Sequence, residues 1–372
     1  MRPKFSFTLP LALSVSAFAL TAQAKVPMVL TDIPAVASLT AQVMGDLGDP
    51  QALLGPGADE HRYQLRPTQA RALQDSDLLI WIGPELTPWL VPAAQSKDGD
   101  HLLGLLASEG TILRSYADEH EDHDDHGHGD HGHDDHAHDD HAHDDHAHGD
   151  HTHDDHEGHA HDDHAHGDHA HDDHEGHAHD DHAHDDHAHE GHDHHGHSHE
   201  GTDPHAWLDP QNAVTWLGTI AERLAVLDPE NAATYRANAE AAQAELTALT
   251  AELEAEIAPV KDLPFVTGHD AYGYLQARFS LNILGSVLLG DATSGGAGHP
   301  RELLAAMKDQ GAVCIFPESQ LDAKPALLLA EGTGVRVGAP IDPSGSTLEA
   351  GAGLYAAMMR DLIGAISTCL KG

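Results

Sequence analysis

The stretch DPENAATYRANAEAAQAELTALTAELEAEI, residues 228–257, decides how this chain is organised. Alanine, glutamate and leucine dominate it, and all three are strong helix formers. The stretch predicts one helix over residues 229–258, roughly 40 Å long at about 1.5 Å per residue. Because a helix of this length exceeds one small domain, we expect it to connect two lobes rigidly.

Short apolar runs alternate with helical patterns on both sides of the long helix, which favours an α/β fold. We expect an N-terminal lobe over residues 25–228 and a C-terminal lobe over residues 259–372. The strands expected in the two lobes are residues 28–30, 77–82, 264–267, 282–289, 312–316 and 335–337. The helices expected beside the long one are residues 33–47, 67–74, 210–227, 300–310, 323–331 and 347–370.

Residues 1–24 have the composition of an export signal peptide. Arg2 and Lys4 precede a mostly apolar run, and Ala22-Gln23-Ala24 is a small-x-small cleavage site. We therefore expect an exported chain that begins at Lys25, with a bacterial periplasm as its compartment. No later apolar run approaches the roughly 20 residues that a membrane helix needs, so no stable membrane insertion is expected.

Residues 118–200 are one tract of DDHAH, GDHAH and HEGHAH units. The tract holds 33 of the 38 histidines and 30 of the 62 acidic residues, and it has no lysine or arginine. Imidazole nitrogen and carboxylate oxygen are ligands for borderline divalent metals. Too little apolar surface is present to form a core. We expect a disordered His/Asp-rich loop, inserted in the N-terminal lobe, that collects metal weakly; the alternative is a repeat expansion that only raises solubility.

The negative charge of the chain indicates which classes of partner it can bind. Its formal net charge is −44, and the part outside the tract still carries 32 acidic against 18 basic residues. No surplus of basic residues remains to neutralise phosphates, which argues against nucleic acid. An acidic exported chain instead fits a protein that meets cations.

The two cysteines lie in different parts of the C-terminal lobe. Cys314 is in the apolar run GAVCIF, and Cys369 is in the last expected helix. An oxidising compartment favours a disulfide between them. The alternative is a pair of thiolate metal ligands, which their isolation from other ligand types disfavours.

Five histidines lie outside the tract: His61, His101, His205, His269 and His299. Three of them are at turns or strand ends, in GPGADEHRYQLRP, TDPHAWLDP and FVTGHDAYGYL, where a side chain can project into a cleft. Three neutral imidazoles with an oxygen ligand make a tetrahedral zinc site. Judged from local context alone, each of these three is as compatible with a capping or surface role as with metal binding. His101 and His299 are expected to have only capping or surface roles.

The segments PGADEHRYQLRP, DPHAWLDP and GHDAYGYL resemble the metal-binding segments of the periplasmic zinc-binding proteins of ABC transporters, the ZnuA type of the cluster A-I solute-binding family. The resemblance covers essentially the whole exported chain, including the acidic His-rich loop, the long helix, the cysteine pair and the CLKG ending. It implies an α/β fold of two similar lobes joined by one long rigid helix, with a metal cleft between them.

The resemblance also implies the metal ligands. His61 and His205 would come from the first lobe and His269 from the second, and a histidine at the last position favours zinc over manganese. Glu60 is the expected fourth ligand, while Asp342, in PIDPSG, and water stay open.

Three further acidic residues are expected to support the ligands. Glu318, in FPESQ, is expected to have a structural or supporting role. Asp203 and Asp270 are candidates for hydrogen bonds to the ring nitrogens that face away from the metal.

The function that follows is high-affinity capture of Zn²⁺ and its delivery to an ABC transporter permease for zinc uptake. Zn²⁺ is then the transported ligand, the protein is no enzyme, and a monomer is expected; a periplasmic metallochaperone is a second candidate partner. The alternative is a periplasmic zinc storage or buffering protein that works mainly through the His-rich loop. A zinc hydrolase is disfavoured because no HExxH pairing or separate general base stands out. An adhesin role is a further alternative, since related proteins occur on cell surfaces.

Overall fold

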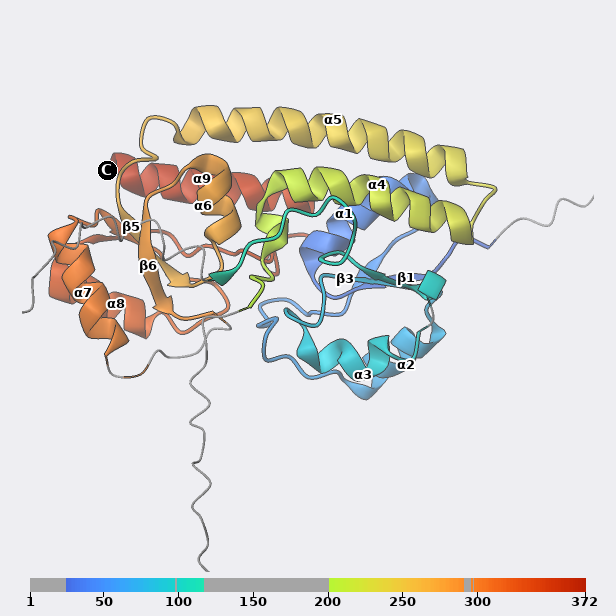
Figure 1. The fold of residues 1–372 in the computed structure, drawn as a ribbon, viewed down its shortest axis with the longest axis horizontal. Coiled ribbons are helices and arrows are strands. Elements are labelled where there is room, and N and C mark those ends of the chain that lie inside the picture. Colours follow the sequence, from blue (N-terminus) through green and yellow to red (C-terminus); the bar gives the residue numbers. More distant parts are fainter. Residues whose placement is uncertain (1–24, 98, 117–200, 291–295, 297) are drawn as a thin grey trace, which may run out of the picture. The chain divides into compact units, whose positions relative to one another are not determined.

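The computed structural model describes residues 25–97, 99–116, 201–290, 296 and 298–372. The predicted signal peptide, residues 1–24, and the His/Asp-rich tract, residues 118–200, lie outside these ranges. The described chain contains two four-stranded parallel sheets with helices around them (Figure 1). Their strand orders, β2-β1-β3-β4 and β6-β5-β7-β8, are the same pattern repeated. The predicted α/β fold of two similar lobes is confirmed.

The first sheet consists of β1 (Val29–Thr31), β2 (Gln51–Ala52), β3 (Leu78–Trp81) and β4 (Leu102–Gly104). Successive residues of a strand point to opposite faces, and here both faces are covered. Leu78 and Ile80 join the core that contains α1 (Pro34–Met44) and α4 (Pro210–Leu227). Leu79 and Trp81 join a smaller cluster with α2 (Pro67–Asp75) and α3 (Val91–Ala94). The unbroken apolar run in β3 is therefore what a strand buried on both faces requires.

The second sheet consists of β5 (Phe265–His269), β6 (Ile283–Leu288), β7 (Cys314–Ile315) and β8 (Arg336–Val337). Phe265 and Cys314 face the core that contains α6 (Gly273–Phe279) and α9 (Leu354–Lys371). Val266 and Ile315 face a second cluster with α7 (His299–Asp309) and α8 (Lys324–Thr333). The two lobes thus use the same layering.

The long helix α5 (Ala232–Ile257) packs against α1, α4 and α9 (Figure 1). Its buried residues recur every three or four positions and form one face: Tyr235, Ala239, Ala242, Leu246, Leu249, Leu253 and Ile257. It begins three residues later than predicted, because Pro229 and Glu230 lie in a turn that the carboxylate of Asp228 stabilises by accepting a hydrogen bond from the Asn231 side chain at 2.7 Å.

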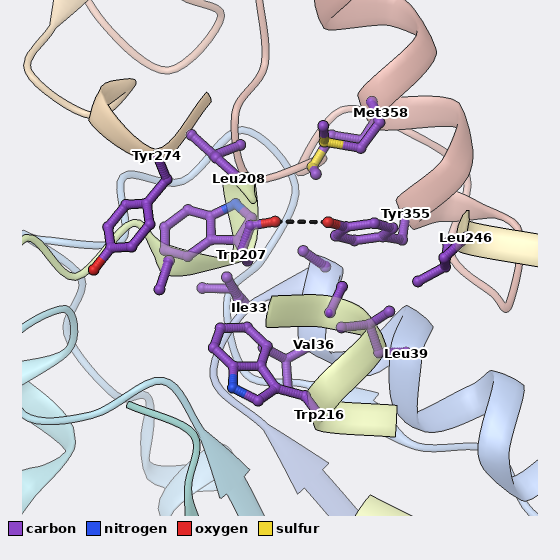
Figure 2. Packing of buried hydrophobic residues seen from close by; sticks show 14 of the residues in the cluster. Ile33, Val36, Leu39, Trp207, Leu208, Trp216, Leu246, Tyr274, Tyr355 and Met358 are labelled. Carbon is purple, nitrogen blue, oxygen red and sulfur yellow. Dashed lines mark hydrogen bonds between the residues drawn. The ribbon is translucent and has the colours of Figure 1, made fainter. Parts of the chain in front are cut away.

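One continuous hydrophobic core connects the two lobes (Figure 2). Trp207, which precedes α4, Trp216 from α4 and Tyr355 from α9 are all fully buried in it. The hydroxyl of Tyr355 donates to the carbonyl oxygen of Trp207 at 2.7 Å, the dashed line of Figure 2. Because each such aromatic side chain buries about 150–250 Å², this shared core resists separation of the lobes.

The predicted disulfide between Cys314 and Cys369 is confirmed. It joins β7 to α9 across a separation of 55 residues, which is worth about 4 kcal/mol on the chain-entropy model. In the part of the chain that the structure describes, no helix is long and apolar enough to cross a bilayer.

The structure corrects the predicted boundaries at several places. The closing helix was expected from residue 347, but α9 begins at Leu354. Residues 347–353 form a loop instead, because Thr347 binds the carboxylate of Asp342 and Gly351 has φ 134°, a value outside the helical region. The short strands β2 and β4 were not predicted, since two or three residues carry too little pattern.

Candidate metal centre

Four side chains converge at one point: Glu60, His61, His205 and His269. One ligand atom of each lies within 4.8 Å of the others. Glu60 and His61 are in the loop between β2 and α2, His205 precedes α4, and His269 is the last residue of β5. The four predicted ligands are therefore brought together from segments up to 209 residues apart in sequence.

The spacing of the imidazole nitrogens suits zinc. Nε2 of His205 lies 3.3 Å from Nε2 of His61 and 3.4 Å from Nε2 of His269. A tetrahedral zinc ion with bonds of about 2.0–2.1 Å places neighbouring nitrogens about 3.3 Å apart. Both Nε2 separations from His205 thus match the value that one zinc ion requires.

Asp203 fixes the orientation of His205. Its Oδ1 accepts hydrogen bonds from the backbone N–H of His205 at 2.9 Å and from the ring Nδ1 at 2.7 Å. A carboxylate only accepts, so the proton of the neutral ring is on Nδ1 and the lone pair is on Nε2. The predicted supporting role of Asp203 is confirmed.

Glu318 holds His269 in the same way. Its Oε1 accepts from the backbone N–H of His269 at 2.9 Å, and its Oε2 pairs with Nδ1 at 2.7 Å. The prediction that Asp270 supports this ring was wrong, because Glu318 occupies Nδ1. The sequence reasoning missed Gly268, where a Cβ atom would lie 2.7 Å from Oε1 of Glu318, so that glycine makes room for the carboxylate.

The buried site shifts the pKa values of its groups in opposite directions. Burial, together with the charge of His269, lowers the pKa of His61 and His205 well below 6.5. Burial also acts to lower the pKa of His269, but the carboxylates of Glu318, Glu60 and Asp270 raise it to about 9. Burial raises the pKa of Glu60 to about 7. Two imidazoles are thus neutral and ready to bind metal at neutral pH, while the third carries a proton that a metal must displace.

Asp342, the alternative fourth ligand, is engaged elsewhere. Its carboxylate accepts hydrogen bonds from the backbone N–H of Ser346 at 3.1 Å and of Thr347 at 2.7 Å, and from the side chain of Gln320. It organises the loop after β8 and is not in the converging group.

His101 and His299 also lie apart from the group. His101 contacts the carbonyl oxygen of Asp77 through Nδ1 at 2.6 Å, and His299 contacts that of Ser286 through Nε2 at 2.8 Å. Both rings are tied to the backbone of their own lobe.

The space at the site is small. A cavity of about 10 Å³ lies among Asp59, Glu60, His61, His269, Glu318, Gln320 and Leu321. A water molecule needs about 10–15 Å³, whereas small-molecule pockets measure about 300–1,000 Å³. A cavity of this size has the dimensions of a single ion.

Two α/β lobes that share a core, with three histidines and a carboxylate brought together from both, define a protein with a buried group of side chains able to hold a metal ion. The family model "Zinc-uptake complex component A periplasmic" (ZnuA) matches residues 29–369, and the chain belongs to this family. The high-affinity zinc uptake system protein ZnuA of Paracoccus denitrificans is 45% identical over 365 residues, covering 98% of both chains. That of Brucella suis is 34% identical over 346 residues, covering 92% of this chain and 91% of the relative.

Solved structures share the fold at low sequence identity. A crystal structure of ZnuA has a TM-score of 0.62 at 18% identity and covers 92% of this chain and 99% of its own. The laminin-binding protein Lmb of Streptococcus agalactiae, described as an adhesin with metal-transporting activity, has a TM-score of 0.62 at 20% identity with the same coverage. The family places the chain among periplasmic solute-binding components of transport systems.

Proposed function

We propose that this chain captures Zn²⁺ in the periplasm and delivers it to the membrane permease of an ABC transporter for zinc uptake. The observation that carries the proposal is the convergence of three Nε2 atoms at 3.3 and 3.4 Å in a chain of the zinc-uptake family. The zinc ion is cargo, and no catalytic step is proposed.

The ligand set in this proposal is His61, His205, His269 and Glu60. Glu60 is favoured over Asp342 because its oxygen lies within the converging group, whereas the carboxylate of Asp342 is occupied by its own loop. Glu60 is also favoured over water as the fourth ligand, because it is 3% exposed and a buried carboxylate needs a compensating charge.

Two features of the site favour the binding of Zn²⁺: its buried negative charges and the fixed orientation of two imidazole rings. Glu60, Asp203 and Glu318 are all buried, and a dication offsets the cost of keeping their negative charges there. Nδ1 of His205 and of His269 is already bonded to a carboxylate, so these rings bind metal with little reorganisation. Both effects favour tight binding.

The remaining parts of the chain have separate roles in this proposal. Residues 1–24 are an export signal, residues 25–228 and 259–372 are the two lobes, and residues 229–258 connect them. The tract of residues 118–200 is a collector of many weak sites that raises the zinc concentration near the cleft. A periplasmic metallochaperone is a second proposed partner, and the protein acts as a monomer.

A chelator-competition titration with zinc tests the proposal, with residues 25–372 compared with the same chain lacking residues 118–200. One tight site should survive the deletion, and His61→Ala, His205→Ala and His269→Ala should each weaken it strongly in the shortened chain. His101→Ala and His299→Ala are matched controls that should retain it. Loss of all tight binding on deletion of the tract would instead identify a storage protein that works through the tract.

A further inference from the structure

The described residues on the two sides of the histidine-rich insertion, 114–116 and 201–203, form a short two-stranded stem. Ser115 and Thr202 form an antiparallel bridge. The backbone N–H of Tyr116 donates to the carbonyl of Gly201 at 3.2 Å, and that of Asp203 donates to the carbonyl of Arg114 at 3.0 Å. The residues that flank the tract, 114–116 and 201–203, are thereby paired.

The hydroxyl of Tyr274 contacts both strands of this stem. It accepts a hydrogen bond from the backbone N–H of Arg114 at 2.9 Å and donates one to the carbonyl of Asp203 at 2.9 Å. Tyr274 is 1% exposed and belongs to α6, five residues after His269. Figure 2 shows its ring beside Trp207, with the hydroxyl directed away from the hydrophobic cluster. One side chain of the C-terminal lobe therefore joins, by two hydrogen bonds, the two backbone segments that flank the insertion in the N-terminal lobe.

This contact matters for the metal site because Asp203 is the residue that orients His205. Oδ1 of Asp203 makes both bonds to His205, at 2.9 and 2.7 Å. Its other oxygen, Oδ2, is buried and has no hydrogen-bond partner among the described residues. The carboxylate is thus not held at its far end. Its position depends on the backbone of Asp203, whose N–H is bonded to Arg114 and whose carbonyl is bonded to Tyr274.

Glu318, the corresponding residue for His269, is held differently. Both of its oxygens are bonded, to the backbone N–H and to Nδ1 of His269, and it packs against Gly268. Asp203 and Glu318, which orient His205 and His269, are therefore held unequally. The position of Asp203 depends on the hydrogen bond from Tyr274.

We propose that Tyr274 is a positioning residue of the zinc site, which fixes the backbone of Asp203 and, through it, the imidazole of His205. The proposal rests on the zinc site proposed above. It adds that one hydroxyl group, on the helix that follows His269, bonds the backbone on both sides of the insertion, including that of the residue that orients His205.

The test is Tyr274→Phe, which removes the hydroxyl and keeps the ring. Tyr235→Phe is the matched control: Tyr235 is fully buried in α5, and its hydroxyl donates to Asp228 at 2.8 Å, in a contact that includes none of the proposed ligands. Both variants should lose some thermal stability in the zinc-free form. Tyr274→Phe should weaken zinc binding about 10-fold, in the range for residues that orient a ligand, whereas Tyr235→Phe should leave affinity unchanged. Zinc affinities equal in the two variants would overturn the proposal.

A double-mutant cycle separates positioning from general destabilisation. If Tyr274 acts through Asp203, the double variant Tyr274→Phe/Asp203→Ala should bind zinc no more weakly than Asp203→Ala alone. The visible spectrum of bound Co²⁺, used as a probe for the ligand geometry, should change in Tyr274→Phe and not in Tyr235→Phe. Additive losses of affinity and an unchanged Co²⁺ spectrum would contradict the proposal. Retention of tight binding by His205→Ala would instead contradict the zinc site itself, so the two failures are distinguishable.

Discussion

The two halves of the proposed metal site are built differently. His205 and His269 each have a buried carboxylate on Nδ1, at 2.7 Å in both cases. The segment around His205 is further held by the C-terminal lobe, since Trp207 donates to the carbonyl of Pro343 at 2.7 Å and Arg278 pairs with Asp209 at 2.6 Å. This half is fixed by contacts from both lobes.

The half that carries Glu60 and His61 has fewer supports. No helix or strand lies between residues 53 and 66. The carbonyl of Glu60 accepts from Trp89 at 2.7 Å, and the N–H of Gly57 donates to Ser346 at 3.3 Å. In the described part of the chain, no carboxylate is bonded to the ring of His61. One half of the site is therefore preorganised and the other half is adjustable. Because the shared core restrains the lobes, we expect zinc to enter and leave with movement of this loop.

The largest effect should come from removal of a ligand on the fixed half. His205→Ala or His269→Ala should weaken zinc binding more than about 100-fold, the upper end of what loss of a supporting residue causes. Each removes a ring that the protein has already oriented. Competition with a chelator of known affinity, in the chain lacking residues 118–200, measures this. The comparison of the two halves fails if His61→Ala is much more damaging than either.

The second largest loss of zinc affinity should follow displacement of Glu318, the carboxylate that orients His269. Gly268→Ala should weaken zinc binding about 10-fold or more, because the new methyl group would lie 2.7 Å from Oε1 of Glu318 and displace it. Gly332→Ala is the matched control, since its added carbon meets Leu304 at an ordinary 3.4 Å within a helix. If Gly268→Ala binds zinc as tightly as Gly332→Ala does, Glu318 does not orient the ligand.

The pH dependence of binding should reflect His269 and Glu60. The pKa of His269 is raised to about 9, so at neutral pH zinc must displace its proton and apparent affinity should rise about 10-fold per pH unit between 7 and 9. Below pH 7 the slope should steepen, because the pKa of Glu60 is raised to about 7 and a second proton competes. The pKa values of His61 and His205 are lowered, so these rings add no competition in this range.

Chelator competition at several pH values, in the chain lacking residues 118–200, measures this profile. Glu318→Gln removes the main charge that raises the pKa of His269, so its profile should level off at a lower pH. A flat profile between pH 7 and 9 in the unsubstituted chain would rule out a protonated His269.

The smallest effect is a difference in backbone dynamics. Amide hydrogen exchange should be faster over residues 55–66 than over residues 203–209 in the zinc-free protein. Zinc should slow exchange in the first segment and change the second little. Equal protection of both segments without zinc would remove the distinction between a fixed and an adjustable half.

Much of this arrangement could be predicted from the sequence, and the exceptions have physical causes. Asp203 was identified as a support because it lies two residues before His205. Glu318 lies 49 residues from His269, and its contact depends on the pairing of β5 with β7, which the sequence does not reveal. Gly268 was a readable signal for that contact, since a glycine within a buried strand often marks close approach of another group.

The boundaries of the long helix and of α9 were less predictable. Local side-chain bonds to Asp228 and Asp342 override the helix-forming tendency of the residues that follow them. The short edge strands β2 and β4 depend on partners in the sheet and have no pattern of their own.

X-ray absorption at the zinc edge tests the central claim most directly, with one equivalent of zinc bound to the chain lacking residues 118–200. The account predicts three imidazole nitrogens and one oxygen at about 2.0–2.1 Å, with two imidazoles left in His61→Ala and three in His101→Ala. An imidazole count that is unchanged by His61→Ala, His205→Ala and His269→Ala would contradict it.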